Sequence, residues 1–215
     1  FRSRILQASG VSFGVLEHAR CTGDPAKQMG NELLFVDLAQ QNIEDFETLG
    51  VEKIITMCAH CYNGFTRYYP ELGGSYQVIP HAVLIEELIE AGMLQLTRGD
   101  GRITFHDPCY LSRQNDIESE ARGVLAAVGE LVEMPRNRKQ SFCCGAGGGN
   151  YWGGEGGERI NEVRSREALD TGAETIATSC PFCLLMLTEG VSKHSAERRV
   201  FDIAELVEQG RDGAG

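Results

Sequence analysis

The sequence predicts an α/β protein of two tandem, pseudo-symmetric domains, in which helices flank mostly parallel sheets. Short β-branched or apolar runs alternate with longer amphipathic stretches through the 215 residues, and this alternation is typical of parallel sheets covered by helices. In addition, one cysteine spacing occurs twice: Cys21 precedes Cys58 by 37 positions, and Cys143 precedes Cys180 by 37 positions. A repeated spacing of this kind indicates a duplicated structural unit.

The first half is predicted to alternate strands and helices. The apolar run 12–16 is expected to be a short strand, and a long helix that begins with a proline is expected over about 25–49. Two more strands are predicted by the β-branched run 53–57 and by residues 77–80. Apolar residues at helical spacing over 83–89 then predict an amphipathic helix.

The second half is predicted to repeat this alternation. Its four expected strands span 102–106, 130–134, 175–179 and 199–203. Its expected helices span 117–128, about 158–171 and the stretch from the last strand to Gly210.

A short glycine-containing segment, 95–101, is expected to link the halves, so the predicted domains are 1–97 and 98–215. In parallel sheets, ligands collect beyond the carboxyl ends of the strands. Three cysteines follow predicted strands closely: Cys58, Cys109 and Cys180. We therefore expect the functional sites at these strand ends.

Composition argues against several classes of function. A net charge of −11 disfavours nucleic-acid backbones and anionic membrane surfaces as ligands. No apolar run is long enough to cross a bilayer, so no direct membrane span is expected in this segment, and no signal peptide is visible at its start. The chain begins at Phe1 rather than at methionine, and the counterpart of Cys109 in the first copy would fall upstream of Phe1. We therefore expect the natural protein to continue before Phe1 and to supply a cysteine there.

The stronger candidate metal site consists of five cysteines of the second half: Cys109, Cys143, Cys144, Cys180 and Cys183. Thiolates in this number favour soft metals, and iron–sulfur clusters above all. A cubane 4Fe–4S cluster and a structural zinc ion each need four ligands. The adjacent pair is awkward for zinc, because neighbouring side chains diverge along an extended backbone, whereas a larger or opened iron–sulfur cluster can take both. Structural zinc, a disulfide framework and plain buried cysteines are the alternative interpretations.

A weaker candidate metal site in the first half consists of Cys21, Cys58 and Cys61. Thr22 stands where the second copy has Cys144. With a cysteine from upstream of the chain start, the set would reach the four ligands of a cubane cluster. The alternative is a degenerate copy whose cysteines are retained for packing.

Residues beside the ligands are expected to tune the second site. Gly145, Gly147 and Gly148 let backbone N–H groups approach cluster sulfurs closely, and such hydrogen bonds stabilise the more negative reduced state. His106 is expected either to orient a ligand or to be a satisfied structural histidine, and His60 is a weaker candidate for the orienting role. Since histidine replaces cysteine on iron in some clusters, neither is excluded as a ligand. No catalytic side chain is predicted beyond the cluster ligands.

The cysteine pattern resembles that of a known family. The motif formed by Cys109, Cys143-Cys144-Gly145 and Cys180-x-x-Cys183 is similar to the cysteine-rich CCG domain of heterodisulfide reductase and of related iron–sulfur subunits of glycolate, lactate and glycerol-3-phosphate dehydrogenases. The stretches 21–32, 105–111, 134–136 and 141–148 most closely resemble the bacterial iron–sulfur oxidoreductases that link electron-transfer flavoprotein to quinone. The resemblance covers nearly the whole chain.

The resemblance implies two tandem CCG domains, with a noncubane 4Fe–4S cluster held by the five cysteines of the second. It implies a second 4Fe–4S cluster in the first domain only if that site is complete, and Thr22 departs there from the two-copy pattern of heterodisulfide reductase. The implied partners are a flavoprotein electron donor and a quinone reached through a membrane region or subunit. The implied location is cytoplasmic, peripheral to the inner face of the membrane, within a larger protein or complex.

Three functions remain open from the sequence. The first is an iron–sulfur electron-transfer module of a membrane-associated oxidoreductase that passes electrons from a reduced flavoprotein toward quinone. The second is a heterodisulfide reductase subunit, in which the opened cluster binds substrate sulfur at a free iron position. The third is a non-enzymatic module that binds structural zinc, and a metal analysis that finds zinc without iron or sulfide would favour it.

Overall fold

The computed structural model describes residues 2–152 and 157–212. The first half contains, in chain order, α1 (Arg2–Ala8), α2 (Asp24–Gln28), α3 (Glu32–Leu49), β1 (Lys53–Thr56), α4 (Ala59–Asn63), the π-helical turn η1 (Gly64–Tyr68), the 3-10 turn η2 (Tyr69–Leu72), β2 (Gln77–Pro80) and α5 (His81–Glu90). The second half contains β3 (Arg102–His106), α6 (Cys109–Asn115), α7 (Glu120–Val128), β4 (Glu130–Leu131), the 3-10 turns η3 (Arg138–Gln140) and η4 (Gly147–Trp152), α8 (Ile160–Asp170), β5 (Thr175–Thr178), α9 (Pro181–His194), β6 (Arg199–Asp202) and α10 (Ile203–Asp212).

Two parallel sheets organise the fold. The first half holds a two-stranded sheet, β1-β2, and the second half holds a four-stranded sheet in the order β4-β3-β5-β6. All pairings among the described strands are parallel. The registers agree between the copies: Thr56, two residues before Cys58, pairs with Pro80, and Thr178, two residues before Cys180, pairs with Asp202. The predicted fold class, parallel sheets flanked by helices, is confirmed.

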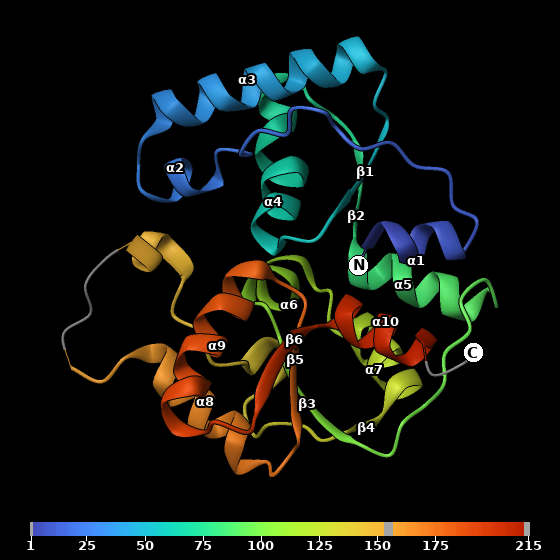
Figure 1. Ribbon diagram of the computed structural model, residues 1–215. Coiled ribbons are helices and arrows are strands. Elements are labelled where there is room, and N and C mark those ends of the chain that lie inside the picture. The colour runs from blue at the N-terminus through green and yellow to red at the C-terminus, as the bar shows by residue number, and fades with distance from the viewer. Residues whose placement is uncertain (1, 153–156, 213–215) are drawn as a thin grey trace.

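Successive side chains of the larger sheet face two helical layers. Ile103 and Phe105 of β3 pack with residues of α7 and α10, whereas Ile176 of β5 packs with residues of α8 and α9. Figure 1 shows the two helical layers on opposite sides of this sheet. Because neighbouring side chains in a strand point to opposite faces, His106 at the end of β3 lies on the α8 side.

The two halves share a hydrophobic core. Helix α5 of the first half packs against α7 and α10 of the second, where Ile85 and Leu88 join Val124, Ala204 and Val207 in one buried cluster. Helix α1 also contacts α10, and Figure 1 shows α1 and α5 beside α7 and α10. The interface between the halves is therefore part of the protein interior.

Two predictions for the N-terminal region are wrong. Residues 12–16, all of them described, form no strand. The helix predicted over 25–49 is instead two helices, α2 and α3. Gly30 adopts a φ of 79°, and the side chain of Asn31 caps α3 by accepting a hydrogen bond from the N–H of Leu34 at 3.2 Å. A left-handed glycine followed by an N-cap residue ends one helix and starts another.

Other elements differ in length or were not predicted. Strand β4 covers only Glu130–Leu131 of the predicted 130–134. Helices α1, α4, α6 and α9 have no counterpart in the prediction, and the first three are too short, at 7, 5 and 7 residues, to produce a readable apolar period. Among the described residues, no helix combines the length and the apolar character that a bilayer crossing requires.

Candidate metal centre

Three candidate ligands lie at the carboxyl ends of parallel strands, as predicted. Cys58 and Cys180 follow β1 and β5 by two residues, and Cys109 follows β3 by three. Cys58 and Cys180 are also the N-cap residues of α4 and α9, and Cys109 is the first residue of α6. The strand–helix junctions therefore place these three sulfurs beyond the carboxyl ends of the strands.

The five cysteines of the second half lie in one run of contacts. The thiol of Cys143 contacts those of Cys109 and Cys144. Cys183 contacts both Cys144 and Cys180, and these last three residues are buried. The side chains of the adjacent residues Cys143 and Cys144 do not diverge, because these residues lie outside any strand. Cys143 also contacts Cys109, and Cys144 also contacts Cys183.

Backbone N–H groups of the glycine-rich loop bond to these sulfurs. The N–H of Gly145 donates to Sγ of Cys143 at 3.3 Å, and the N–H of Gly147 bonds to the same thiol. Gly145 has a φ of 97°, in the left-handed region that favours glycine, and Gly148 lies further along the loop with a φ of 65°. Contacts from two neighbouring cysteine thiols, and then these N–H groups, lower the pKa of Cys143 far below its ordinary value.

The first half repeats this arrangement with one substitution. The N–H of Gly23, whose φ is 82°, donates to Sγ of Cys21 at 3.4 Å, which reproduces the glycine–cysteine bond of the second copy. Oγ1 of the buried Thr22 donates to Sγ of Cys61 at 3.5 Å, where the second copy has a contact between two thiols. Cys61 also contacts Cys58. A hydroxyl thus occupies the place of one ligand thiol, and three cysteines remain.

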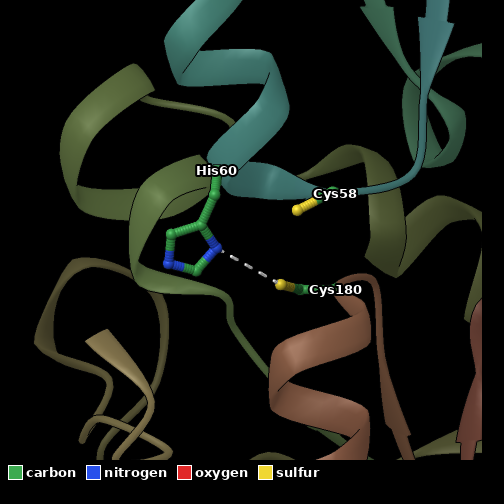
Figure 2. A group of neighbouring side chains, drawn as sticks. All are labelled: Cys58, His60 and Cys180. Atoms are coloured by element: carbon green, nitrogen blue, oxygen red, sulfur yellow. Dashed lines mark hydrogen bonds between the residues drawn. The ribbon is translucent and has the colours of Figure 1, made fainter. Parts of the chain in front are cut away.

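The two cysteine sets meet at the interface between the halves. Figure 2 shows Cys58 and His60 of the first half beside Cys180 of the second. A ring nitrogen of His60 and the two sulfurs all lie within 4.8 Å of one another, and Nδ1 of His60 is 3.9 Å from Sγ of Cys180. Burial lowers the pKa of His60, but the contact with Cys180 and nearby negative charge outweigh that effect and raise it above its ordinary value. The spacing of the cysteines indicates two separate sets, one in each half, so the sequence did not reveal the contact between His60 and Cys180.

His106 has no ring lone pair available for a metal. Nε of Arg164, which can only donate, lies 3.0 Å from Nδ1 of His106, so Nδ1 accepts this bond and the proton of the neutral ring is on Nε2. Burial, reinforced by the positive charge of Arg164, lowers the pKa of His106 to about 3. A ring nitrogen of His106 lies within 4.8 Å of the sulfurs of Cys144 and Cys183. The geometry therefore places His106 beside the thiols as an oriented neighbour.

Two buried arginines that the sequence did not reveal, Arg164 and Arg122, hold the loop before Cys143. Arg164 also donates to Oγ of Ser141 at 3.3 Å, and Ser141 donates to the carbonyl oxygen of Asp107 at 3.2 Å. Arg122 donates two hydrogen bonds to the carboxylate of Asp107, at 2.7 and 3.0 Å. Arginine is mostly exposed in proteins, so no sequence pattern marked these two as buried.

The donor set fits an iron–sulfur cluster. Clustered thiols provide soft ligands, and N–H donors directed at sulfur are a common feature of such sites. All eight cysteines lie in the described residues, and each is a free thiol. The alternative of a disulfide framework therefore has no counterpart in this structure.

Comparison with known proteins agrees with this chemistry. The sequence profile of a family described as the cysteine-rich domain, CCG, matches residues 2–66 and 103–188, one match in each half. The EtfAB:quinone oxidoreductase of Syntrophomonas wolfei is 40% identical over 217 residues, covering 95% of this chain and 30% of that protein. The probable iron-sulfur-binding oxidoreductase FadF of Bacillus subtilis is 40% identical over 219 residues, covering 99% of this chain and 31% of that protein.

A third relative comes from an archaeon. One subunit of the dihydromethanophenazine:CoB--CoM heterodisulfide reductase of Methanosarcina barkeri is 32% identical over 216 residues, covering 95% of this chain and 53% of that protein. This chain spans about a third of the length of the two bacterial relatives. The iron–sulfur names of the relatives and the cysteine geometry together support an iron–sulfur cluster as the cofactor. With both halves matched and both cysteine sets accounted for, the chain belongs to the cysteine-rich CCG domain family.

Proposed function

We propose that this chain is the iron–sulfur electron-transfer module of a membrane-associated oxidoreductase, and that it passes electrons from a reduced flavoprotein toward quinone. The observation that carries the proposal is the run of contacts that links the five thiols, together with the two backbone N–H groups that bond to Cys143. The donor and acceptor classes come from the name of the EtfAB:quinone oxidoreductase relative. Because quinones dissolve in the bilayer, we also propose a cytoplasmic location peripheral to the inner face of the membrane.

In this proposal the second domain, 98–215, holds a noncubane 4Fe–4S cluster. Its ligands are Cys109, Cys143, Cys144, Cys180 and Cys183. When bound, such a cluster supplies one-electron oxidation and reduction. The chain contributes the thiolates and the N–H groups of Gly145 and Gly147, which stabilise negative charge on sulfur. It also buries Cys144, Cys180 and Cys183, so water is kept from three of the five ligands.

The first domain, 1–97, is proposed to bind a second 4Fe–4S cluster only when a fourth ligand joins Cys21, Cys58 and Cys61. Thr22 cannot replace the missing thiolate, because a threonine hydroxyl remains protonated at neutral pH and is a poor ligand for soft iron. Its bond to Cys61 preserves the packing of the site instead. Whether or not the first half binds iron, its residues Cys58 and His60 would lie beside Cys180, a proposed ligand of the second cluster.

A second candidate function is heterodisulfide reduction. The observation that favours it is the 32% identity to a heterodisulfide reductase of Methanosarcina barkeri, in which the match covers about half of the related polypeptide. In this case an iron position left open by the protein would bind a substrate sulfur. Turnover of a thiol heterodisulfide by the purified full-length protein would support this function, and the absence of turnover in an iron-loaded sample would exclude it.

Metal analysis tests the proposed function directly. The full-length protein, purified without oxygen, is expected to contain iron and acid-labile sulfide in comparable amounts. Zinc without iron or sulfide would favour a structural zinc module and contradict the electron-transfer proposal.

The assignment of ligands to the second domain is tested by Cys144→Ser, with Cys21→Ser as the matched control. We expect Cys144→Ser to abolish or shift the electron paramagnetic resonance signal of the second cluster, because the serine oxygen is a harder and weaker ligand for iron. Cys21→Ser should leave that signal intact, since Cys21 bonds within its own half. The opposite pattern would mean that the two halves are assigned the wrong way round.

A further inference from the structure

A histidine from the first half faces a ligand of the second centre. His60 lies on α4, between Cys58 and Cys61, yet its Nδ1 is 3.9 Å from Sγ of Cys180, 120 residues further along the chain. Figure 2 shows the imidazole directed across the interface toward this sulfur. The contact is thus made between the halves and not within the Cys-x-x-Cys motif that contains the histidine.

Packing holds the imidazole in this orientation. The ring of His60 lies against Tyr110 with centroids 4.3 Å apart and an interplanar angle of 36°. On another side Phe182 meets it edge-on, with centroids 4.9 Å apart and an angle of 68°. His60 is only 8% exposed, so neighbouring side chains restrict its rotation. A ring fixed in this way presents the same nitrogen to Cys180 throughout.

The duplication shows that an aromatic ring alone would satisfy the packing. In the Cys-x-x-Cys motif of the second half, Phe182 occupies the position that His60 occupies in the first, and these two equivalent rings contact each other across the interface. Phenylalanine provides the ring but no N–H group. The second motif therefore supplies no imidazole of its own at this position, and the imidazole beside its first cysteine comes from the other half.

We propose that His60 is a positioning residue of the second centre, whose Nδ1–H donates a hydrogen bond to the sulfur of Cys180. This inference rests on the proposed function, in which Cys180 is a ligand of an iron–sulfur cluster. A hydrogen bond to a ligand sulfur stabilises the added negative charge of the reduced state and so raises the reduction potential. Through His60, the first half tunes the potential of a cluster held by the second.

The test replaces His60 by phenylalanine, the residue that the second copy has at the same position. His60→Phe keeps an aromatic ring between Tyr110 and Phe182 but removes the N–H donor. The full-length protein is labelled with 15N-histidine, purified without oxygen and examined by redox titration and by pulsed electron paramagnetic resonance. We expect His60→Phe to keep its iron and sulfide, to lower the midpoint potential of the second cluster and to lose one weak nitrogen coupling.

Two further variants make the result specific. His60→Asn places an amide N–H close to the position of Nδ1, so it should restore part of the lost potential, which a purely structural role would not explain. His18→Phe makes the same chemical change at an exposed histidine and should leave both readouts unchanged.

Three other outcomes distinguish a failure of the inference about His60 from a failure of the proposed function. An unchanged potential and an unchanged nitrogen coupling in His60→Phe would overturn the inference about His60 while leaving the proposed function in place. A strong nitrogen coupling typical of an iron-bound imidazole would also overturn it, because His60 would then be a ligand. Absence of iron and sulfide from the unmodified protein would instead contradict the proposed function itself.

Discussion

Single side chains account for the chemical difference between the two copies. Thr22 and Cys144 occupy equivalent buried positions, and each contacts the second cysteine of its Cys-x-x-Cys motif. Threonine fills a similar volume and keeps a hydrogen bond to sulfur, but it does not provide a soft anionic ligand. This substitution therefore removes one candidate ligand thiol from the first half while a contact to Cys61 is kept.

His106 predicts a loss of stability in acid. Its pKa is about 3 in the folded protein, against an ordinary value near 6.5, because burial and Arg164 oppose its protonation. Between these values the unfolded chain binds a proton at this site that the folded chain does not. The free energy of unfolding should therefore fall as pH falls below about 6.5, by at most about 1.4 kcal/mol per pH unit from this residue. Urea unfolding at pH 7 and pH 5 measures the effect.

The matched variant for this test is His106→Gln. Glutamine does not titrate, and its side-chain oxygen can still accept the hydrogen bond from Arg164. The acid-induced loss of stability should be smaller in this variant than in the unmodified protein. An equal loss in both proteins would show that other groups cause the pH dependence.

The cysteines stand out in the sequence more clearly than the residues around them do. The repeat and the soft-ligand rule singled them out as candidate ligands, and five of them lie in one run of contacts. Their coordination of a metal stays a prediction. The roles of His60 and Arg164 depend on contacts over 120 and 58 residues, and no local spacing encodes such distances. The buried state of Arg164 was also unpredictable, since arginine is rarely found inside a protein.

At the scale of elements, the close packing of α8 on α9 keeps the second Cys-x-x-Cys motif in place. Gly190 of α9 faces α8, and a Cβ atom added there would lie 2.3 Å from Oγ of Ser165 and 2.7 Å from the backbone oxygen of Asn161. The side-chain amide of Asn161 donates to the carbonyl oxygen of Met186 at 3.1 Å, which links the same two helices. Only glycine allows the helices to approach this closely.

Gly190→Ala is therefore expected to destabilise the protein by about 1–3 kcal/mol, because the added methyl group forces the two helices apart. Urea unfolding of the metal-free protein measures the change. Gly14→Ala is the control, since no atom lies within 4 Å of its added Cβ, and its effect should stay within about 0.5 kcal/mol. Equal stability of the two variants would mean that α8 and α9 can separate without cost.

Strands marked by runs of β-branched residues were predicted well, whereas helix ends that depend on the backbone angles or the capping side chain of one residue were not. The strands at 53–57, 102–106 and 175–179 are present with small changes at their ends, because β-branched runs followed by cysteine are distinctive. The break between α2 and α3 depends on the backbone of Gly30 and the cap formed by Asn31, both of which lie inside an otherwise continuous helical pattern.

In the whole molecule, the two halves meet through equivalent parts of their cysteine motifs. Equivalent residues meet across the interface, as Cys58 does with Cys180 and His60 with Phe182. The halves are also joined by a buried hydrogen bond between Nε2 of His81 and the carboxylate of Asp202, at 3.1 Å. Such an arrangement places both cysteine sets at one interface, which the sequence repeat could not reveal because it carries no information on how two copies pack.

We propose that five sulfurs of the second half surround one iron–sulfur cluster. Crystals of the full-length protein grown without oxygen can be measured at the iron absorption edge, where anomalous scattering locates iron atoms. We expect a compact group of iron peaks enclosed by the sulfurs of Cys109, Cys143, Cys144, Cys180 and Cys183. A single zinc peak at this position, or iron peaks that lie away from these five sulfurs, would contradict it.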